Sequence, residues 1–125
     1  MYIYSFEKLE VWQLARRLVK VIYELTAFFS TEEKYGLSSQ LRRASVSVLS
    51  DIAEGASRSS LKEQCYYLER AYGSLMEIYS QLCIAMDLSY ITQEKSDTVN
   101  LLIRELSNKL NSLRNTFRKK IIQQQ

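Results

Sequence analysis

Between Ser60 and Asp87, apolar side chains recur at alternating steps of three and four residues. Such spacing places them along one seam of an α-helix that packs against other helices, as in a coiled coil. Ser60, followed three positions later by Glu63, forms a capping-box pattern at the start of this segment. We therefore predict a helix over residues 61–87. Its expected seam residues are Cys65, Leu68, Tyr72, Leu75, Tyr79, Leu82 and Met86.

The rest of the chain has the composition of long helices joined by short turns, because its 125 residues contain no proline and only three glycines. Apolar residues at helical spacing predict helices over residues 7–29, 37–54 and 92–119, the last of them capped by Thr92. We expect Gly55 to end the second helix in a left-handed conformation, and Gly73 to allow a neighbouring helix to approach closely. The predicted fold class is all-α, with one domain, residues 1–125, forming an antiparallel up-down-up-down four-helix bundle.

The residues that the sequence lacks exclude several function classes. Without histidine the chain cannot form a Cys-His nucleophile, a Ser-His-Asp triad or the usual zinc sites. Cys65 and Cys83 would lie roughly 27 Å apart on one helix, too far for a disulfide, and we expect both to be buried thiols of a cytoplasmic protein. We expect no enzymatic activity, no cofactor, no metal and no membrane-spanning segment.

Positive charge gathers toward the end of the chain. The net charge is +3, but residues 89–125 carry seven cations against three anions, and no acidic residue follows Glu105. Such a surplus attracts nucleic-acid phosphates and releases their counterions. Cations in a last helical turn also interact favourably with the helix dipole, and this second explanation stays open. The candidate nucleic-acid-binding residues, on the first and fourth predicted helices, are Arg16, Arg17, Lys20, Lys109, Arg114, Arg118, Lys119 and Lys120.

The second predicted helix carries a polar stripe beside its apolar face, and five of its residues are serines, which are weaker helix formers than Glu, Lys or Ala. Small hydroxyl residues suit close packing against another helix or subunit, with an arginine reaching a carboxylate across the contact. Asp51 and Glu54, one helical turn apart, form a carboxylate pair, but a surface pair between Glu54 and Arg58 is the simpler use of that charge. Packing between subunits and packing within the chain's own bundle both remain open. The candidate oligomer or helix-packing residues are Arg42, Arg43, Ser47, Asp51 and Glu54.

Three segments carry a resemblance to a known family: FEKLEVWQLARRL, EKYGLSSQLRRASVSVLSDIAEGASR and YLERAYGSLMEIYSQL. They are similar to the proteins encoded by open reading frames within intervening sequences of bacterial 23S ribosomal RNA genes, and the resemblance covers roughly residues 5–120. It implies a left-handed antiparallel four-helix bundle that assembles as a homopentamer and has no catalytic activity. More remotely, the chain is similar to the accessory proteins of diversity-generating retroelements, which are basic pentamers that bind nucleic acid and a reverse transcriptase.

Two positions depart from the usual pattern of this family. Leu49 stands where the family commonly has proline, and Asp51 where it commonly has asparagine. Loss of the proline predicts a straighter second helix, since proline kinks a helix interior. Asp51 puts a charge where a neutral amide is expected.

The function we expect is that of a non-enzymatic, oligomeric helical-bundle protein that binds RNA or DNA without sequence specificity, through basic surface on the first and fourth helices. The alternative is a scaffold for protein partners that binds no nucleic acid. A salt titration separates nucleic-acid binding from a protein scaffold, because the affinity of a protein for phosphates falls steeply as the salt concentration rises.

Overall fold

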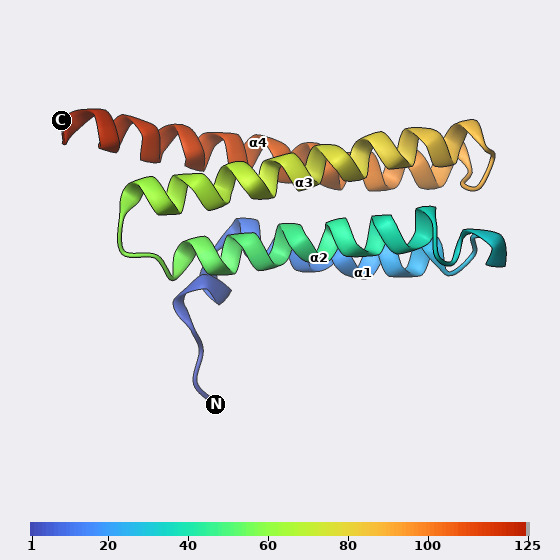
Figure 1. Cartoon of the computed structure of the whole chain (residues 1–125), viewed down its shortest axis with the longest axis horizontal. Helices are drawn as coiled ribbons and strands as arrows, with labels where there is room; N and C mark the ends of the chain where they lie inside the picture. The colour runs from blue at the N-terminus through green and yellow to red at the C-terminus, as the bar shows by residue number, and fades with distance from the viewer. Residues whose placement is uncertain (125) are drawn as a thin grey trace.

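The computed structural model describes residues 1–124 as four long helices, with two short 3₁₀ turns and, within those residues, no β-strand (Figure 1). Consecutive helices run in opposite directions, with α1 and α2 in one layer and α3 and α4 in the other (Figure 1). The elements are η1 Ser5–Lys8, α1 Glu10–Thr26, η2 Thr31–Glu33, α2 Leu37–Ala56, α3 Leu61–Asp87 and α4 Gln93–Gln123. The predicted all-α, four-helix fold is therefore confirmed.

One apolar core runs along the centre of the bundle. Each helix packs against two others, α1 and α3 both lying beside α2 and α4. All four helices contribute fully buried side chains, among them Leu18, Leu41, Leu75 and Leu106. Burying a side chain of this size stabilises a fold by about 1.5–3 kcal/mol, so this core supplies much of the stability of the bundle.

The helix bounds differ from the predicted ones mainly in α1 and α4. The first helix begins at Glu10 rather than at residue 7, because residues 5–8 form a separate 3₁₀ turn, and it ends at Thr26. α3 spans the predicted range, and α4 runs four residues further than predicted, to Gln123. The oxygen atoms of both predicted caps accept a backbone N–H: Ser60 from Glu63 at 3.1 Å and Thr92 from Lys95 at 3.2 Å.

The roles predicted for two glycines are wrong. Gly55 lies inside α2 and has no left-handed φ; it is buried, and a Cβ placed on it would come within 2.8 Å of the Tyr67 Cβ. Gly73 is exposed, and a Cβ there would meet no atom within 4 Å. Close helix approach is therefore the role of Gly55, at the contact between α2 and α3.

The predicted seam of the third helix is wrong at three of its seven positions. Ala71, Ile78 and Ala85 are buried in place of their neighbours Tyr72, Tyr79 and Met86. Ala71 and Ala85 are small and let α3 approach its partners closely, while Tyr72 is half-buried and Tyr79 is exposed at the flank of the seam.

The two cysteines differ from each other in exposure. Cys65 is buried, and burial raises the pKa of its thiol, while Cys83 is exposed, which contradicts the prediction that both are buried. Both are free thiols, as their separation on one helix requires.

Two further sequence features can be located in the fold. α2 is one continuous helix through Leu49, the position at which the family commonly has proline. Over residues 1–124, none of the helices combines the length and apolar character that crossing a bilayer requires.

Candidate nucleic-acid and subunit interfaces

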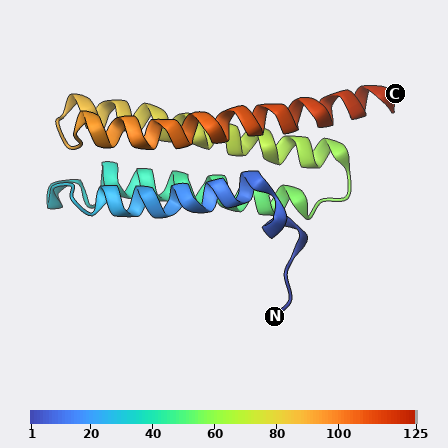
Figure 2. The ribbon, with the colours of Figure 1, turned by 180° about the vertical axis from the view of Figure 1, so that it is seen from behind.

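The last fourteen residues of α4 project beyond the start of α1. A salt bridge of 2.9 Å between Lys109 Nζ and Glu10 Oε1 sets the first residue of α1 level with Lys109. The fourteen residues from 110 to 123 continue past that point for roughly 21 Å. Figure 2 shows this end of α4 reaching beyond the other helices. We call residues 110–123 the overhang.

Three of the candidate cations on α4 are held by contacts within the chain. Lys109 pairs with Glu10, and this hydrogen bond raises the pKa of the lysine. Arg118 Nη2 donates to Glu69 Oε1 at 2.6 Å, which likewise raises the pKa of the arginine. Arg114 donates to Asn111 at 2.6 Å and lies over the Tyr72 ring of α3, 4.9 Å from its centroid. These cations position α4 and offer only part of their charge to a ligand.

Lys119 and Lys120 remain exposed at the end of the overhang and form no ion pair within residues 1–124. The N-terminus of α3 lies beside them, because Lys62 lines a shallow groove together with Ile121 and Gln124. Lys62 is exposed and adds a third cation to this end of the bundle. Sequence reasoning missed Lys62 because it belongs to a different helix, and only the packing of α3 on α4 brings it close.

The candidate cations of α1 lie elsewhere. Arg16, Arg17 and Lys20 are exposed on α1, and Arg16 lies over the Trp12 ring, 5.5 Å from its centroid. With Glu10 level with Lys109, Arg17 and Lys119 are roughly 25 Å apart along the bundle axis. The single basic surface expected from the sequence is therefore divided into two groups.

The polar stripe of α2 faces α3 for much of its length. Arg43 Nη2 lies 3.2 Å from Glu77 Oε1, and Asp51 Oδ1 lies 3.5 Å from Arg70 Nε. The exposed Arg43–Glu77 pair contributes about 0–1 kcal/mol, so it sets the register of the two helices more than their stability. Ser47 is half-buried in the same stripe.

The remaining two candidates of α2 have other partners. Arg42 turns toward α1, where its Nε donates to the Thr26 hydroxyl at 2.8 Å and its guanidinium lies 4.6 Å from the centre of the Tyr23 ring. Glu54 and Arg58 are 3.9 Å apart, in the surface pair that the sequence suggested. Four of the five candidates thus have partners within their own bundle.

Asp51 is the one carboxylate buried in this stripe, with 8% of its surface exposed. Burial raises the pKa of its carboxyl, and the neighbouring Arg70 partly opposes that shift. Arg70 also donates to the Tyr66 hydroxyl at 3.3 Å, so the ion pair is part of a larger polar contact on α3. The Glu54 carboxylate, one helical turn away, also raises the pKa of Asp51.

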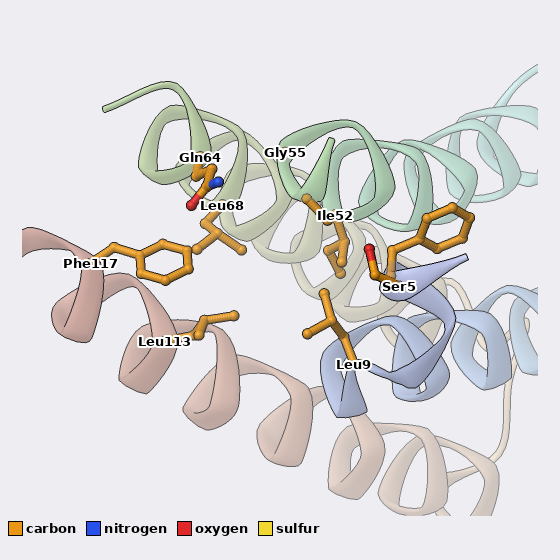
Figure 3. A pocket seen from close by; sticks show the side chains of 10 residues that line it. Ser5, Leu9, Ile52, Gly55, Gln64, Leu68, Leu113 and Phe117 are labelled. Carbon is orange, nitrogen blue, oxygen red and sulfur yellow. The ribbon is translucent and has the colours of Figure 1, made fainter. Parts of the chain in front are cut away.

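An apolar cleft of about 220 Å³ opens where α2 ends, α3 begins and the overhang leaves the bundle (Figure 3). It is smaller than the roughly 300–1,000 Å³ of pockets that hold cofactors or drug-sized ligands. Its one amide, of Gln64, donates to the Arg58 carbonyl at 2.6 Å. Residues 1–124 contain no cluster of three or more metal-ligating side chains. The cleft is lined chiefly by Leu9, Ile52, Gly55, Leu68, Leu113 and Phe117.

Comparison with known proteins agrees with this architecture. The sequence matches the family of 23S rRNA-intervening sequence proteins over residues 7–112. The chain belongs to this family. No curated protein matches it.

A solved structure of a protein of unknown function from the S23 ribosomal protein family of Bacteroides thetaiotaomicron superposes with a TM-score of 0.78. The two sequences are 24% identical, and the match covers 84% of this chain and 95% of the other. At that identity the likeness shows a shared fold. A shared fold does not imply a shared activity, so the function of this 23S rRNA-intervening sequence protein depends on the residues of its own surface.

Proposed function

We propose that this chain is a non-enzymatic, self-associating bundle protein that contacts RNA or DNA phosphates, without reading their sequence, through the basic end of α4. The observation that carries the proposal is the overhang. It projects past α1, contains no acidic side chain, and ends in the exposed Lys119 and Lys120 beside Lys62 of α3. A projecting cationic helix can reach a phosphate backbone without displacing any part of the core.

Self-association supports the proposed nucleic-acid contact, because an oligomer carries several times the small net charge of one chain. One chain carries a net charge of only +3. The resemblance implies a homopentamer, in which five overhangs would act together and raise the affinity well beyond that of one copy. The more remote resemblance of the sequence to retroelement accessory proteins implies a basic pentamer as well. The free, exposed thiol of Cys83 supports a reducing, cytoplasmic location.

The test is a salt titration of binding to a fluorescent single-stranded RNA and to a DNA duplex. For each phosphate neutralised, the slope of log affinity against log salt becomes steeper by about 0.9 for a duplex and about 0.7 for a single strand. We expect Lys119→Gln combined with Lys120→Gln to weaken binding and flatten the slope, with little effect on which sequence is bound. Absence of binding at low salt would refute the proposal.

A matched control is available in α1. Arg17→Gln combined with Lys20→Gln removes the same charge from an exposed helix surface roughly 25 Å away. If this pair weakens binding as strongly as the pair in α4, the overhang has no special role and net charge alone explains the affinity.

The second candidate function is a scaffold for protein partners. It is favoured by exposed apolar side chains on the outer surface of α3 and α4, where Tyr79 and Leu101 border a shallow groove. Exposed apolar patches of this kind mark contact surfaces. The same titration decides between the candidates, since apolar contacts hold or strengthen as salt rises.

A further inference from the structure

Four aromatic side chains near the start of the chain form one continuous row. The rings of Tyr2 and Tyr4 meet edge to face, with centroids 4.8 Å apart. The Phe6 ring follows, 6.1 Å from that of Tyr4 and 5.2 Å from that of Trp12. The Arg16 guanidinium lies over the Trp12 ring, 5.5 Å from its centroid, and ends the row on α1. We call Tyr2, Tyr4, Phe6 and Trp12 the aromatic row.

The aromatic row is held by the bundle at one end and is open to solvent at the other. Trp12 packs against the core and Phe6 lines the apolar cleft, and both are half-buried. Tyr2 is 76% exposed and Tyr4 is 59% exposed. Figures 1 and 2 show this segment leading away from the helices. Exposed apolar rings that gather in this way mark a binding surface.

Tyr4 is positioned by contacts within the chain before any ligand binds. Its N–H donates to Glu7 Oε2 at 2.7 Å, and its carbonyl accepts from the Glu7 N–H at 3.0 Å. Its ring is 12° from parallel with that of Phe6. Two rings that hold one base between them are about 6.8 Å apart, because stacked bases are separated by about 3.4 Å. The 6.1 Å between these two centroids is close to that spacing, and positioning before binding lowers the entropy cost of binding.

The charges around the aromatic row favour a polyanion as its ligand. Arg16 and Lys8 are exposed, and neither forms an ion pair within residues 1–124. Of the neighbouring carboxylates, Glu10 pairs with Lys109 at 2.9 Å, and Glu7 accepts a backbone N–H. Rings alone would suit an apolar protein surface equally well. Rings beside unpaired cations match a single-stranded nucleic acid, whose bases stack and whose phosphates need positive charge.

The aromatic row also leads toward the overhang. Phe6 and Phe117 line the same cleft, and the Lys120 ammonium lies over the Phe117 ring, 5.8 Å from its centroid. A strand whose bases stack on the exposed rings can therefore place its next phosphates at the end of the overhang. A duplex cannot use the rings in this way, because its bases are paired and stacked on one another and must first be pulled out.

We propose that the aromatic row binds the bases of single-stranded RNA or DNA, which stack on Tyr2 and Tyr4 while the phosphates contact Arg16 and the overhang. Since every base has an aromatic face, such a site distinguishes single strands from duplexes and does not read sequence. This inference rests on the proposed contact with nucleic acid, and it names single strands as the class that binds most tightly.

The test compares binding of a labelled oligouridylate strand and of a DNA duplex of the same length to the full chain. Tyr2→Leu combined with Tyr4→Leu removes two exposed rings and keeps apolar side chains in their place. We expect it to weaken binding of the single strand at least about fivefold, because each stacked base contributes that much, and to change duplex binding less than about twofold. Tyr2→Phe combined with Tyr4→Phe retains both rings and should bind as wild type does.

Tyr35 provides the matched control. It is 87% exposed at the opposite end of the bundle, and the Lys34 ammonium lies over its ring, 5.5 Å from the centroid. Tyr35→Leu should leave the affinity for the single strand unchanged. An equal loss in Tyr35→Leu, or an equal loss for strand and duplex in the variant of Tyr2 and Tyr4, would overturn the proposal. Full affinity for the strand in that variant would also overturn it and leave the aromatic row to a protein partner.

The salt dependence separates this inference from the proposed function. Stacking is uncharged, so the leucine variant of Tyr2 and Tyr4 should keep the wild-type slope of log affinity against log salt, whereas the glutamine variant of Lys119 and Lys120 flattens it. If the lysine variant behaves as expected but the leucine variant binds the strand as wild type does, the aromatic row fails and the phosphate contact stands. If wild type binds neither probe at low salt, both fail.

Discussion

At one end of the bundle the two inter-helix loops close over the core, whereas at the other end the core opens into a cleft. The closed end joins α1 to α2 and α3 to α4. There the rings of Phe29 and Tyr90 pack with centroids 5.4 Å apart, and the Tyr90 hydroxyl donates to Glu33 Oε1 at 3.1 Å, which raises the pKa of the tyrosine. The other carboxylate oxygen of Glu33 accepts the Leu37 N–H at 3.0 Å. One side chain thus ties the second loop to the start of α2.

The open end has no comparable closure. Phe117 and Leu113 are half-buried beside the cleft, and the backbone of residues 1–4 leads away from the helices (Figure 1). The exposed Lys119 and Lys120 lie at this same end. The comparison teaches that the chain completes its own core at one end and leaves apolar and cationic groups unmatched at the other. The proposed nucleic-acid contact lies at the open end for this reason.

Truncating one phenylalanine at each end gives the largest expected contrast. Phe29 is buried at the closed end, so Phe29→Ala should lower the free energy of unfolding by about 3–5 kcal/mol. Phe117 is half-buried, and Phe117→Ala should cost the monomer less than about 2 kcal/mol. Urea denaturation measures both. Equal losses would mean that the two ends are packed equally well.

Gly55 tests how tightly α2 and α3 meet beside the cleft. Gly55→Ala should lower the free energy of unfolding by about 1–3 kcal/mol, because its Cβ would lie 2.8 Å from that of Tyr67 and the helices must move apart. Gly73→Ala is the control, in open space on the next helix, and should raise stability by up to about 1 kcal/mol. If both substitutions raise the stability, α2 and α3 can move apart beside the cleft at little cost in free energy.

The closed end contains one strained residue that can be improved. Ser89, with φ 61°, is the only non-glycine residue in the left-handed region among those the structure describes. It follows α3 in a Schellman motif, in which the Tyr90 N–H donates to the Ala85 carbonyl at 2.8 Å. Ser89→Gly should raise the free energy of unfolding by about 0.5–1 kcal/mol, visible as a higher Tm. A lower Tm would show that the serine side chain stabilises this turn.

Asp51 should give the smallest effect, seen in the pH dependence of stability. Burial raises the pKa of its carboxyl above the ordinary value of 3.8, so its contribution to stability is complete below pH 3.8 and is lost as the pH rises through the raised pKa. Asp51→Asn cannot titrate. Its stability relative to wild type should therefore increase from pH 4 upward and then level off, in urea denaturation at a series of pH values. A relative stability that falls with pH would mean that the ion pair with Arg70 outweighs burial.

The candidate site could be predicted only in part. The cations of α4 were found because they follow one another in the sequence, and Lys62 was missed because it reaches them through the packing of α3 on α4. The partners of Arg43 and Asp51, which are Glu77 and Arg70, lie on the next helix, at a distance along the chain that no local pattern reveals. The cap supplied by Glu33 was missed as well, since Gly36, directly before α2, offers no side chain to suggest one.

The sequence by itself determined that this protein is a bundle of four helices, because helical periodicity, caps and the lack of proline act within a few residues of one another. Only the tertiary structure decided which of two neighbouring residues is buried at three positions of α3. Whether α3 buries Tyr72 or its neighbour Ala71 depends on how closely α2 and α4 approach, and Gly55 controls one of those approaches. The overhang has the same origin, since it follows from the level at which α1 begins along α4, where Glu10 meets Lys109. Such offsets between helices depend on contacts between distant segments, and those exist only once the chain has folded.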